Sequence, residues 1–156
     1  MDHLTVRAES SAATNASELH ALFEDAVLRV CRLAGIAPEE QHFAVASRAF
    51  ELGGVPFALE FDEPSGFVKV YADAGRPSMA SAPGVYRALL EHQLYFPPPF
   101  QVLVGVHPLS EHIVIYACAP LPSSAQSDDN FLALLHSCVN IVRFLSHEVE
   151  GMHPLQ

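Results

Sequence analysis

Short apolar segments separated by turn residues constrain this chain more than any other feature. They are predicted to be strands over residues 42–52, 55–63, 66–75, 100–106 and 112–119. The first three follow one another through Gly53–Gly54 and the sequence EPSG, and the last two are joined through HPLSE. Connections this short join antiparallel neighbours, because parallel neighbours need a crossover of about a dozen residues or more. The chain is therefore predicted to form one antiparallel, twisted sheet of about five strands.

Three longer segments repeat apolar side chains at helical spacing and are predicted to be helices. They cover residues 17–35, 81–96 and 127–149. Asn15 and Glu18 fit a capping box before the first helix, and Gly35 fits its end. Pro83 lies near the first position of the second helix, and Ser127 is expected to cap the third. The predicted fold is α+β, in the order α-β-β-β-α-β-β-α.

The length of 156 residues suits a single domain that buries about two thirds of its unfolded surface without disulfide or metal crosslinks. Neither an internal repeat nor a domain boundary interrupts the pattern. We expect residues 17–150 to form this domain. Residues 1–16 are small and polar and are expected to be a flexible amino terminus, and residues 151–156 a short tail.

The charge balance excludes several classes of partner. Asp and Glu number 18 against 8 Lys and Arg, and the net charge of −10 opposes binding to nucleic acid or to anionic lipid. No apolar run approaches the length that spans a membrane, so no membrane insertion is expected. The three cysteines show no CxxC spacing, and the first residues contain no apolar signal-peptide core. These features predict a cytoplasmic protein.

The last two predicted strands differ from those before them because both of their faces are apolar. Three helices can cover one face of a five-stranded sheet, so a second apolar face suggests another copy of the chain. We therefore expect a homodimer. Its interface is predicted to include Val85, Leu89, Ile113 and Ile115 or their immediate neighbours.

The stretch HIVIYACAP, residues 112–120, brings an imidazole, a phenol and a thiol into one segment. On a strand, His112 and Cys118 would lie about 20 Å apart, so they cannot act together without partners from other segments. The nine histidines form no HExxH motif. We therefore predict no catalytic residue, no metal and no cofactor. A small cytoplasmic α+β enzyme that uses Cys118 or a histidine stays an alternative, as does a peptide-binding module outside secretion.

The order of elements resembles the class I chaperones of bacterial type III secretion, the Tir chaperone family. The resemblance covers roughly Ser17 to Val149. The pieces that carry it are YRALLEHQLYF, FQVLVGVHPLSEHIVIYACAPL and FLALLHSCVNIVRFL. They are similar to that family's second helix, the strand pair that follows it and the closing amphipathic helix.

The resemblance implies a homodimer without enzymatic activity. Such a chaperone binds the amino-terminal chaperone-binding segment of a secreted effector and keeps it soluble and export-competent. The binding groove is expected where the first helix meets the first strands, and an extended peptide can add its backbone to a strand edge there. The residues expected to bind the effector are Leu19, Leu22, Phe23, Val30, Phe43, Val45 and Phe50.

Overall fold

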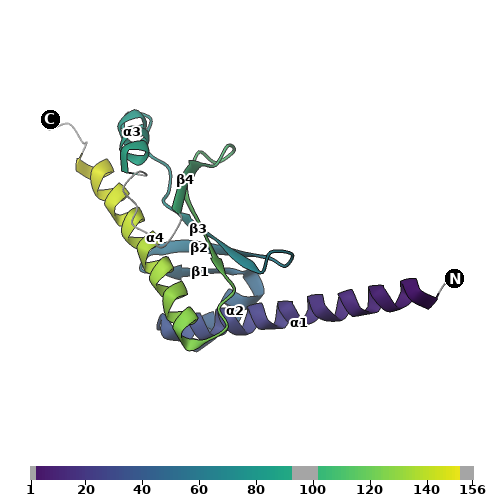
Figure 1. Cartoon of the computed structure of the whole chain (residues 1–156). Helices are drawn as coiled ribbons and strands as arrows, with labels where there is room; N and C mark the ends of the chain where they lie inside the picture. The colour runs from purple at the N-terminus through teal and green to yellow at the C-terminus, as the bar shows by residue number, and fades with distance from the viewer. Residues whose placement is uncertain (1–2, 93–101, 152–156) are drawn as a thin grey trace.

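A computed structural model describes residues 3–92 and 102–151 of the chain (Figure 1). Its elements are α1 (His3–Leu33), α2 (Pro38–Ser47), β1 (Ala49–Leu52), β2 (Val55–Asp62), β3 (Phe67–Asp73), α3 (Ala82–His92), β4 (Val102–Val106), β5 (Ile113–Pro120) and α4 (Ala125–Gly151). The predicted end of the second helix at residues 93–96, the first residues 100–101 of the fourth strand and residues 152–156 of the tail lie outside the described residues.

The five strands form one antiparallel sheet in the order β1-β2-β3-β5-β4. This confirms the α+β class and the single antiparallel sheet. The helix count was wrong, because the described residues contain four helices and the prediction had three. The sheet order leaves β1 at one edge and β4 at the other.

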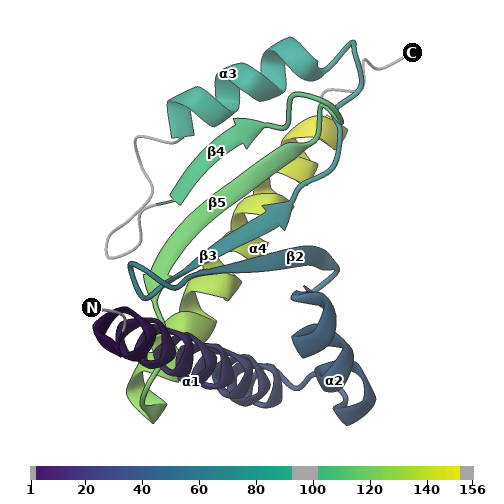
Figure 2. The ribbon, with the colours of Figure 1, turned by 90° about the vertical axis from the view of Figure 1, so that its right-hand side faces the viewer.

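One face of the sheet forms the core, and α1 and α4 pack on it. Leu59, Val70, Ala117 and Val102 lie side by side across β2, β3, β5 and β4, and all four are buried. Figure 2 shows α4 running behind the strands, on this covered face. The apolar stripe predicted for the last helix is confirmed for Phe131, Leu134, Leu135, Cys138, Val142 and Leu145, which are all buried.

The opposite face of the sheet is open to the viewer in Figure 2. On β2 and β3 this face carries charged side chains, and Lys69 forms an ion pair with Glu60 in which Nζ lies 2.7 Å from Oε1. Toward β5 it becomes aromatic, with the rings of Tyr71 and Tyr116 centred 5.4 Å apart. Hydrogen bonds from Lys69 and from Tyr71 lower the pKa of Glu60. The single wet face predicted for these two strands is therefore confirmed.

Residues 42–47 form the second half of α2, although the sequence pattern had predicted a strand from residue 42. Pro38 occupies the start of the helix, and Glu39 and Glu40 follow in its first turn, where carboxylates favour the helix dipole. The segment is rich in Glu, Gln and Ala, which are good helix formers. Only residues 49–52 of the predicted strand are extended, as β1.

Helix α1 begins at His3, so residues 3–16 are helical. This part contains several good helix formers and neither Gly nor Pro, so nothing in it stops the helix. Asn15 and Glu18 therefore lie inside α1 and do not mark its start, although the sequence pattern had predicted this. Figure 1 shows the amino-terminal half of α1 projecting away from the rest of the chain.

The predicted end of α1 at Gly35 is confirmed, because Gly35 adopts φ +74° just after the helix. The Ile36 N–H donates to the Cys31 carbonyl over 3.0 Å, and the Gly35 N–H donates to Arg32 over 3.1 Å. This pair of bonds satisfies two carbonyls of the last turn. The reversal sends the chain directly into α2.

Helix α4 begins with a reciprocal pair of serines. The Ser124 N–H donates to Ser127 Oγ over 2.8 Å, and the Ser127 N–H donates to Ser124 Oγ over 3.3 Å. The cap is thus Ser124, three residues before the predicted Ser127. One turn later Asp128 is nearly buried and accepts two bonds from Arg29 of α1, over 2.9 and 3.2 Å. This fork-shaped contact fixes α1 against α4.

Candidate binding surfaces at the two edges of the sheet

A groove of about 480 Å³ lies between α2 and the β1–β2 hairpin. Its lining residues are Ile36, Glu40, Phe43, Ala49, Phe50, Glu51, Pro56 and Phe57. The rings of Phe50 and Phe57 stack with their centres 5.4 Å apart, and Phe43 is 67 % exposed. An exposed phenylalanine beside a stacked aromatic pair provides a site for an apolar side chain.

Strand β1 contributes its free edge to this groove. The Leu59 N–H donates to the Arg48 carbonyl over 2.8 Å, which sets the alternation of hydrogen bonds between β1 and β2. This alternation directs the N–H and C=O groups of Ala49 and Glu51 away from β2. The Ala49 N–H donates to Ser47 Oγ over 3.3 Å. The Ser47 hydroxyl donates to the Phe43 carbonyl over 2.7 Å, with the Ala49 carbonyl as a longer second acceptor at 3.1 Å. Glu51 is therefore the one residue of β1 whose outward N–H and C=O groups both lack a hydrogen bond to another described residue.

The charge of the groove is entirely negative. Glu40 of α2 and Glu51 of β1 are both exposed, and the other lining residues are apolar. No Lys or Arg lines the groove. An approaching cation would therefore meet two carboxylates and no competing positive charge from the lining.

The effector-binding residues predicted from the sequence fall into three groups by their position and exposure. Phe43 and Phe50 line the groove, and Leu22 is exposed on α1. Leu19 and Val45 are half-buried. Phe23 and Val30 are buried and belong to the core of the single chain.

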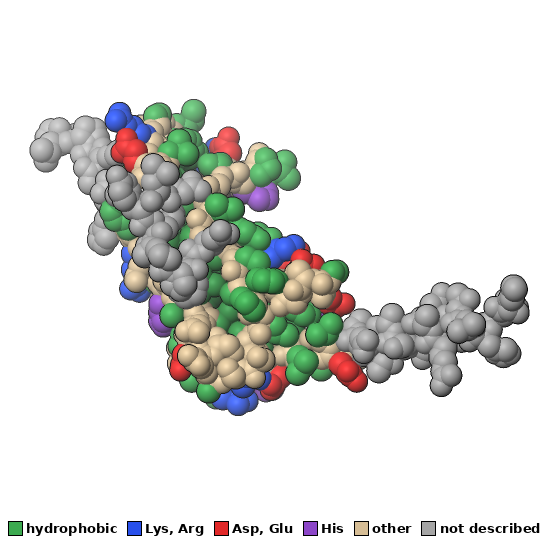
Figure 3. Space-filling model, viewed as in Figure 1, with side chains coloured by type: hydrophobic (Ala, Val, Ile, Leu, Met, Phe, Trp, Pro, Cys, Tyr) green, Lys and Arg blue, Asp and Glu red, His purple; other side chains and the backbone are tan. Residues whose placement is uncertain are grey.

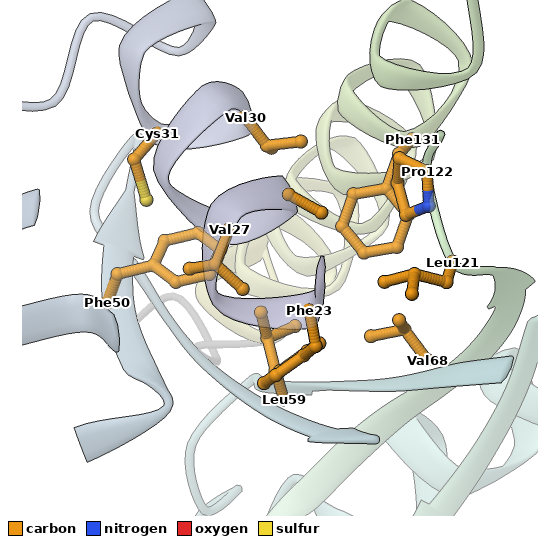
Figure 4. Close-up of a pocket in the computed structure, with 11 residues that line it drawn as sticks. Phe23, Val27, Val30, Cys31, Phe50, Leu59, Val68, Leu121, Pro122 and Phe131 are labelled. Carbon is orange, nitrogen blue, oxygen red and sulfur yellow. The ribbon is translucent and has the colours of Figure 1, made fainter. Parts of the chain in front are cut away.

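Phe23, Val30 and Phe50 border a second cavity, enclosed between α1, the sheet and the start of α4. Figure 4 shows its side chains converging from these elements. Its volume is about 10 Å³, roughly the room that one water molecule occupies. The cavity is a packing defect of the core and is too small to hold a side chain from a partner.

Strand β4 forms the other edge and has no charged side chain. The His107 N–H donates to the His112 carbonyl over 2.8 Å, which directs the N–H and C=O groups of Val102, Val104 and Val106 outward. No hydrogen bond to another described residue occupies these groups. On the open face beside this edge Leu103 is 53 % exposed. Figure 3 shows hydrophobic side chains along the middle of the described surface, with charged side chains mainly at its margins.

The four residues predicted for a dimer interface are buried within the single chain. Val85 and Leu89 face inward from α3, and Ile113 and Ile115 lie on the covered face of β5. Their neighbours provide the exposed surface in this region. Leu90 follows Leu89 and is 69 % exposed.

Among the polar residues of HIVIYACAP, His112 lies apart from the other two. His112 Nδ1 lies 2.9 Å from Asp73 Oδ2 just before β5, whereas Tyr116 and Cys118 are neighbours on the open face farther along the strand. Ser110 Oγ lies 3.2 Å from His107 Nδ1 and accepts a bond from the backbone N–H of His112, but it does not contact the His112 ring that faces Asp73. Ser110, the His112 ring and Asp73 therefore do not form one chain of side-chain hydrogen bonds. The described residues also contain no cluster of three metal-ligating side chains.

The other two cysteines are buried and free. Burial raises the pKa of Cys31 to about 11 and that of Cys138 to about 12. Both thiols are therefore neutral and unreactive near pH 7. None of the described helices has the length and hydropathy needed to cross a membrane.

Sequence reasoning missed α2 and with it the groove residues Ile36 and Glu40. Pro38 followed by two glutamates could have indicated the helix start, since proline and acidic residues favour the first turn. The blocking of Ala49 by Ser47 has no signal in the sequence, because it depends on how α2 meets β1.

Comparisons with known proteins found no match for this chain. No protein family, no curated protein and no solved structure is similar to it.

Proposed function

We propose that this chain is a chaperone of type III secretion, which binds the amino-terminal segment of a secreted effector and keeps it soluble and export-competent. The observation that supports the proposal is the groove beside the free edge of β1, where Phe43 is exposed. An extended segment gains backbone bonds from the edge and buries apolar side chains in the groove. Folded proteins shorten, charge or cover most of their strand edges, so the arrangement favours an unfolded partner.

The apolar part of the groove supplies the affinity. Burying a Val, Leu, Ile, Phe or Met side chain contributes roughly 1.5–3 kcal/mol, whereas the single free backbone pair at Glu51 contributes about 1 kcal/mol per bond. Contact with one groove is therefore weak. Stable binding of a long segment needs further contacts, which α1 offers at Leu22.

We further propose that the chain acts as a homodimer through the edge of β4 and the open face next to it. An antiparallel pairing centred on Val104 would bond its N–H and C=O groups to those of the same residue in the second copy. The exposed side chains of Leu103 and Val106 would be buried with them. A dimer of this kind would hold two grooves, one on each copy.

The test is co-expression of the full chain with candidate effectors, followed by purification and limited proteolysis. We expect a stable complex in which one extended effector segment is protected, and we expect Phe43→Asp to remove the protection. Met79→Asp is the matched control, because Met79 is exposed and does not line the groove. An effector segment that stays protected in Phe43→Asp would contradict this site, and a partner that is not secreted would favour the general peptide-binding module.

A further inference from the structure

Glu51 is the single residue of β1 that combines an unbonded outward backbone pair with a charged side chain on the groove. We propose that the groove selects segments with an apolar–basic–apolar triplet, in which Lys or Arg pairs with Glu51 and the flanking apolar residues lie on the Phe50 side. This inference rests on the proposed function and names the class of segment that the groove takes.

The register follows from the hydrogen bonds of β1. Because the Ala49 N–H is bonded to Ser47, Glu51 is the residue of β1 that offers an incoming strand both an unbonded N–H and an unbonded C=O. In an antiparallel hydrogen-bonded pair the two residues place their side chains on the same face. The side chain opposite Glu51 therefore lies beside its carboxylate.

The neighbours of that residue point to the other face, because side chains alternate along a strand. On that face β1 presents Phe50, which stacks on Phe57. Phe43 of α2 is the exposed aromatic ring of the same groove. Of the two residues on either side of the central one, the first thus lies opposite Phe50 and meets aromatic surface, and the second lies opposite Leu52, which is also apolar, while the central one meets carboxylate.

The charges of the groove favour a cation at the central position. Glu40 adds a second carboxylate from α2, and no basic side chain lines the groove. A glutamate in the segment would instead meet like charge. Exposed pairs are screened by water, so the selectivity between lysine and serine is expected to be about two- to fivefold.

The experiment uses the full chain and three synthetic peptides that differ in one residue. Each peptide carries Leu-Lys-Leu, Leu-Ser-Leu or Leu-Glu-Leu at the centre of a neutral Ser/Thr/Gly frame, and fluorescence anisotropy measures its Kd. We expect the lysine peptide to bind about two- to fivefold more tightly than the serine peptide, and the glutamate peptide to bind most weakly.

The decisive variant is Glu51→Gln, which keeps the backbone pair and removes the charge. It should weaken binding of the lysine peptide and strengthen binding of the glutamate peptide, whereas damage to the groove would weaken both. Glu63→Gln is the matched control, because Glu63 is exposed and lies outside the groove.

Two results would overturn the inference in different ways. Equal Kd values for the three peptides, with binding lost in Phe43→Asp, would remove the charge selection and leave the proposed segment-binding function intact. No binding of any peptide would overturn the pairing at Glu51, and the effector co-purification would then decide separately whether the chain is a chaperone.

Discussion

The two edges of the sheet are built in opposite ways. Strand β1 has four residues, a glutamate on its outer side and a serine that occupies part of its backbone. Strand β4 has five residues, all Val, Leu or Gly, and its outward backbone groups form no hydrogen bond within the described residues. One edge is charged and partly bonded, and the other is uncharged and unbonded.

The difference separates a surface suited to temporary binding from one that needs a permanent cover. Natural sheets shorten, charge or cover their edges, because an apolar unpaired strand pairs with other chains. Strand β1 follows this rule except at the backbone groups of Glu51, so a partner strand can form only a few hydrogen bonds with it. Strand β4 does not follow it, which is why we place the dimer there and the effector segment at β1.

The largest effect on stability is expected for a charge in the core next to β4, and a charge on the open face there should affect only the dimer. Ile113→Asp buries a charge without a partner and should remove most of the free energy of unfolding, since such a charge costs several kcal/mol against a net stability of about 5–15 kcal/mol. Leu103→Asp places the same charge on the open face and should leave the fold intact but split the dimer. Thermal unfolding and sedimentation distinguish the two results.

If Ile113→Asp unfolded no more easily than Leu103→Asp, β5 would not have the covered face described above. If Leu103→Asp stayed dimeric, the dimer would lie elsewhere on the molecule. A wild-type chain that sediments at 16.9 kDa at micromolar concentration would contradict the dimer itself.

The second prediction tests strand pairing at β4. Val104→Pro removes an outward N–H but no bond to β5, so the single chain should tolerate it as edge strands tolerate proline. By symmetry both copies lose a bond, and the dimer Kd should rise by about tenfold or more. Sedimentation equilibrium measures this change.

Val104→Thr is the matched control, because threonine is also β-branched and keeps the N–H. It should dimerise with a Kd near that of the wild type. Equal Kd values for the proline and threonine variants would show that the copies meet through side chains of the open face and not through paired β4 edges.

The third prediction concerns the β1 side and has a smaller effect. Phe43→Asp should weaken binding of a Leu-containing segment about five- to tenfold, since it removes the exposed ring of the groove and adds a third carboxylate. Its dimer Kd and melting temperature should match those of Met79→Asp. Leu22→Asp shows whether the segment continues along α1, and unchanged binding by both Phe43→Asp and Leu22→Asp would exclude this side of the molecule.

The sheet was predictable from the sequence because its signals are local. Alternating side chains and short turns fixed the strands, and the Gly53–Gly54 turn adopts the positive φ angles, +61° and +84°, that glycine favours. The stripe of α4 was equally clear, since its apolar positions repeat over about four turns, from Phe131 to Leu145. These features depend on residues close together in the chain.

The binding surfaces were less predictable because they depend on distant contacts. Phe23 and Phe43 are both apolar residues near the first elements, yet one is buried and the other is exposed. Only the packing of α2 beside β1 separates them, and the sequence had predicted a strand for much of α2. The buried positions of Ile113 and Leu89 likewise depend on the contacts of α4 with the sheet and with α3.

The smallest expected effect is a change in the labelling rate of Cys118, which reports on the β4 edge. It lies on the open face of β5 beside the proposed dimer surface, whereas Cys31 and Cys138 are buried. Their pKa values of about 11 and about 12 keep both thiols protonated at pH 8, so a maleimide should label Cys118 alone in the folded protein. The two buried thiols should react only after unfolding.

The labelling rate of Cys118 should then report on the dimer and not on the groove. Dimerisation covers part of the open face, so Val104→Pro should raise the rate about two- to threefold, the size expected for partial shielding of a half-exposed thiol. A Leu-Lys-Leu peptide bound at β1 should leave the rate unchanged, because β2 and β3 separate that edge from β5. A peptide that slowed the labelling as strongly as dimerisation would show that segments also bind the β4 side, and the division of roles between the two edges would be wrong.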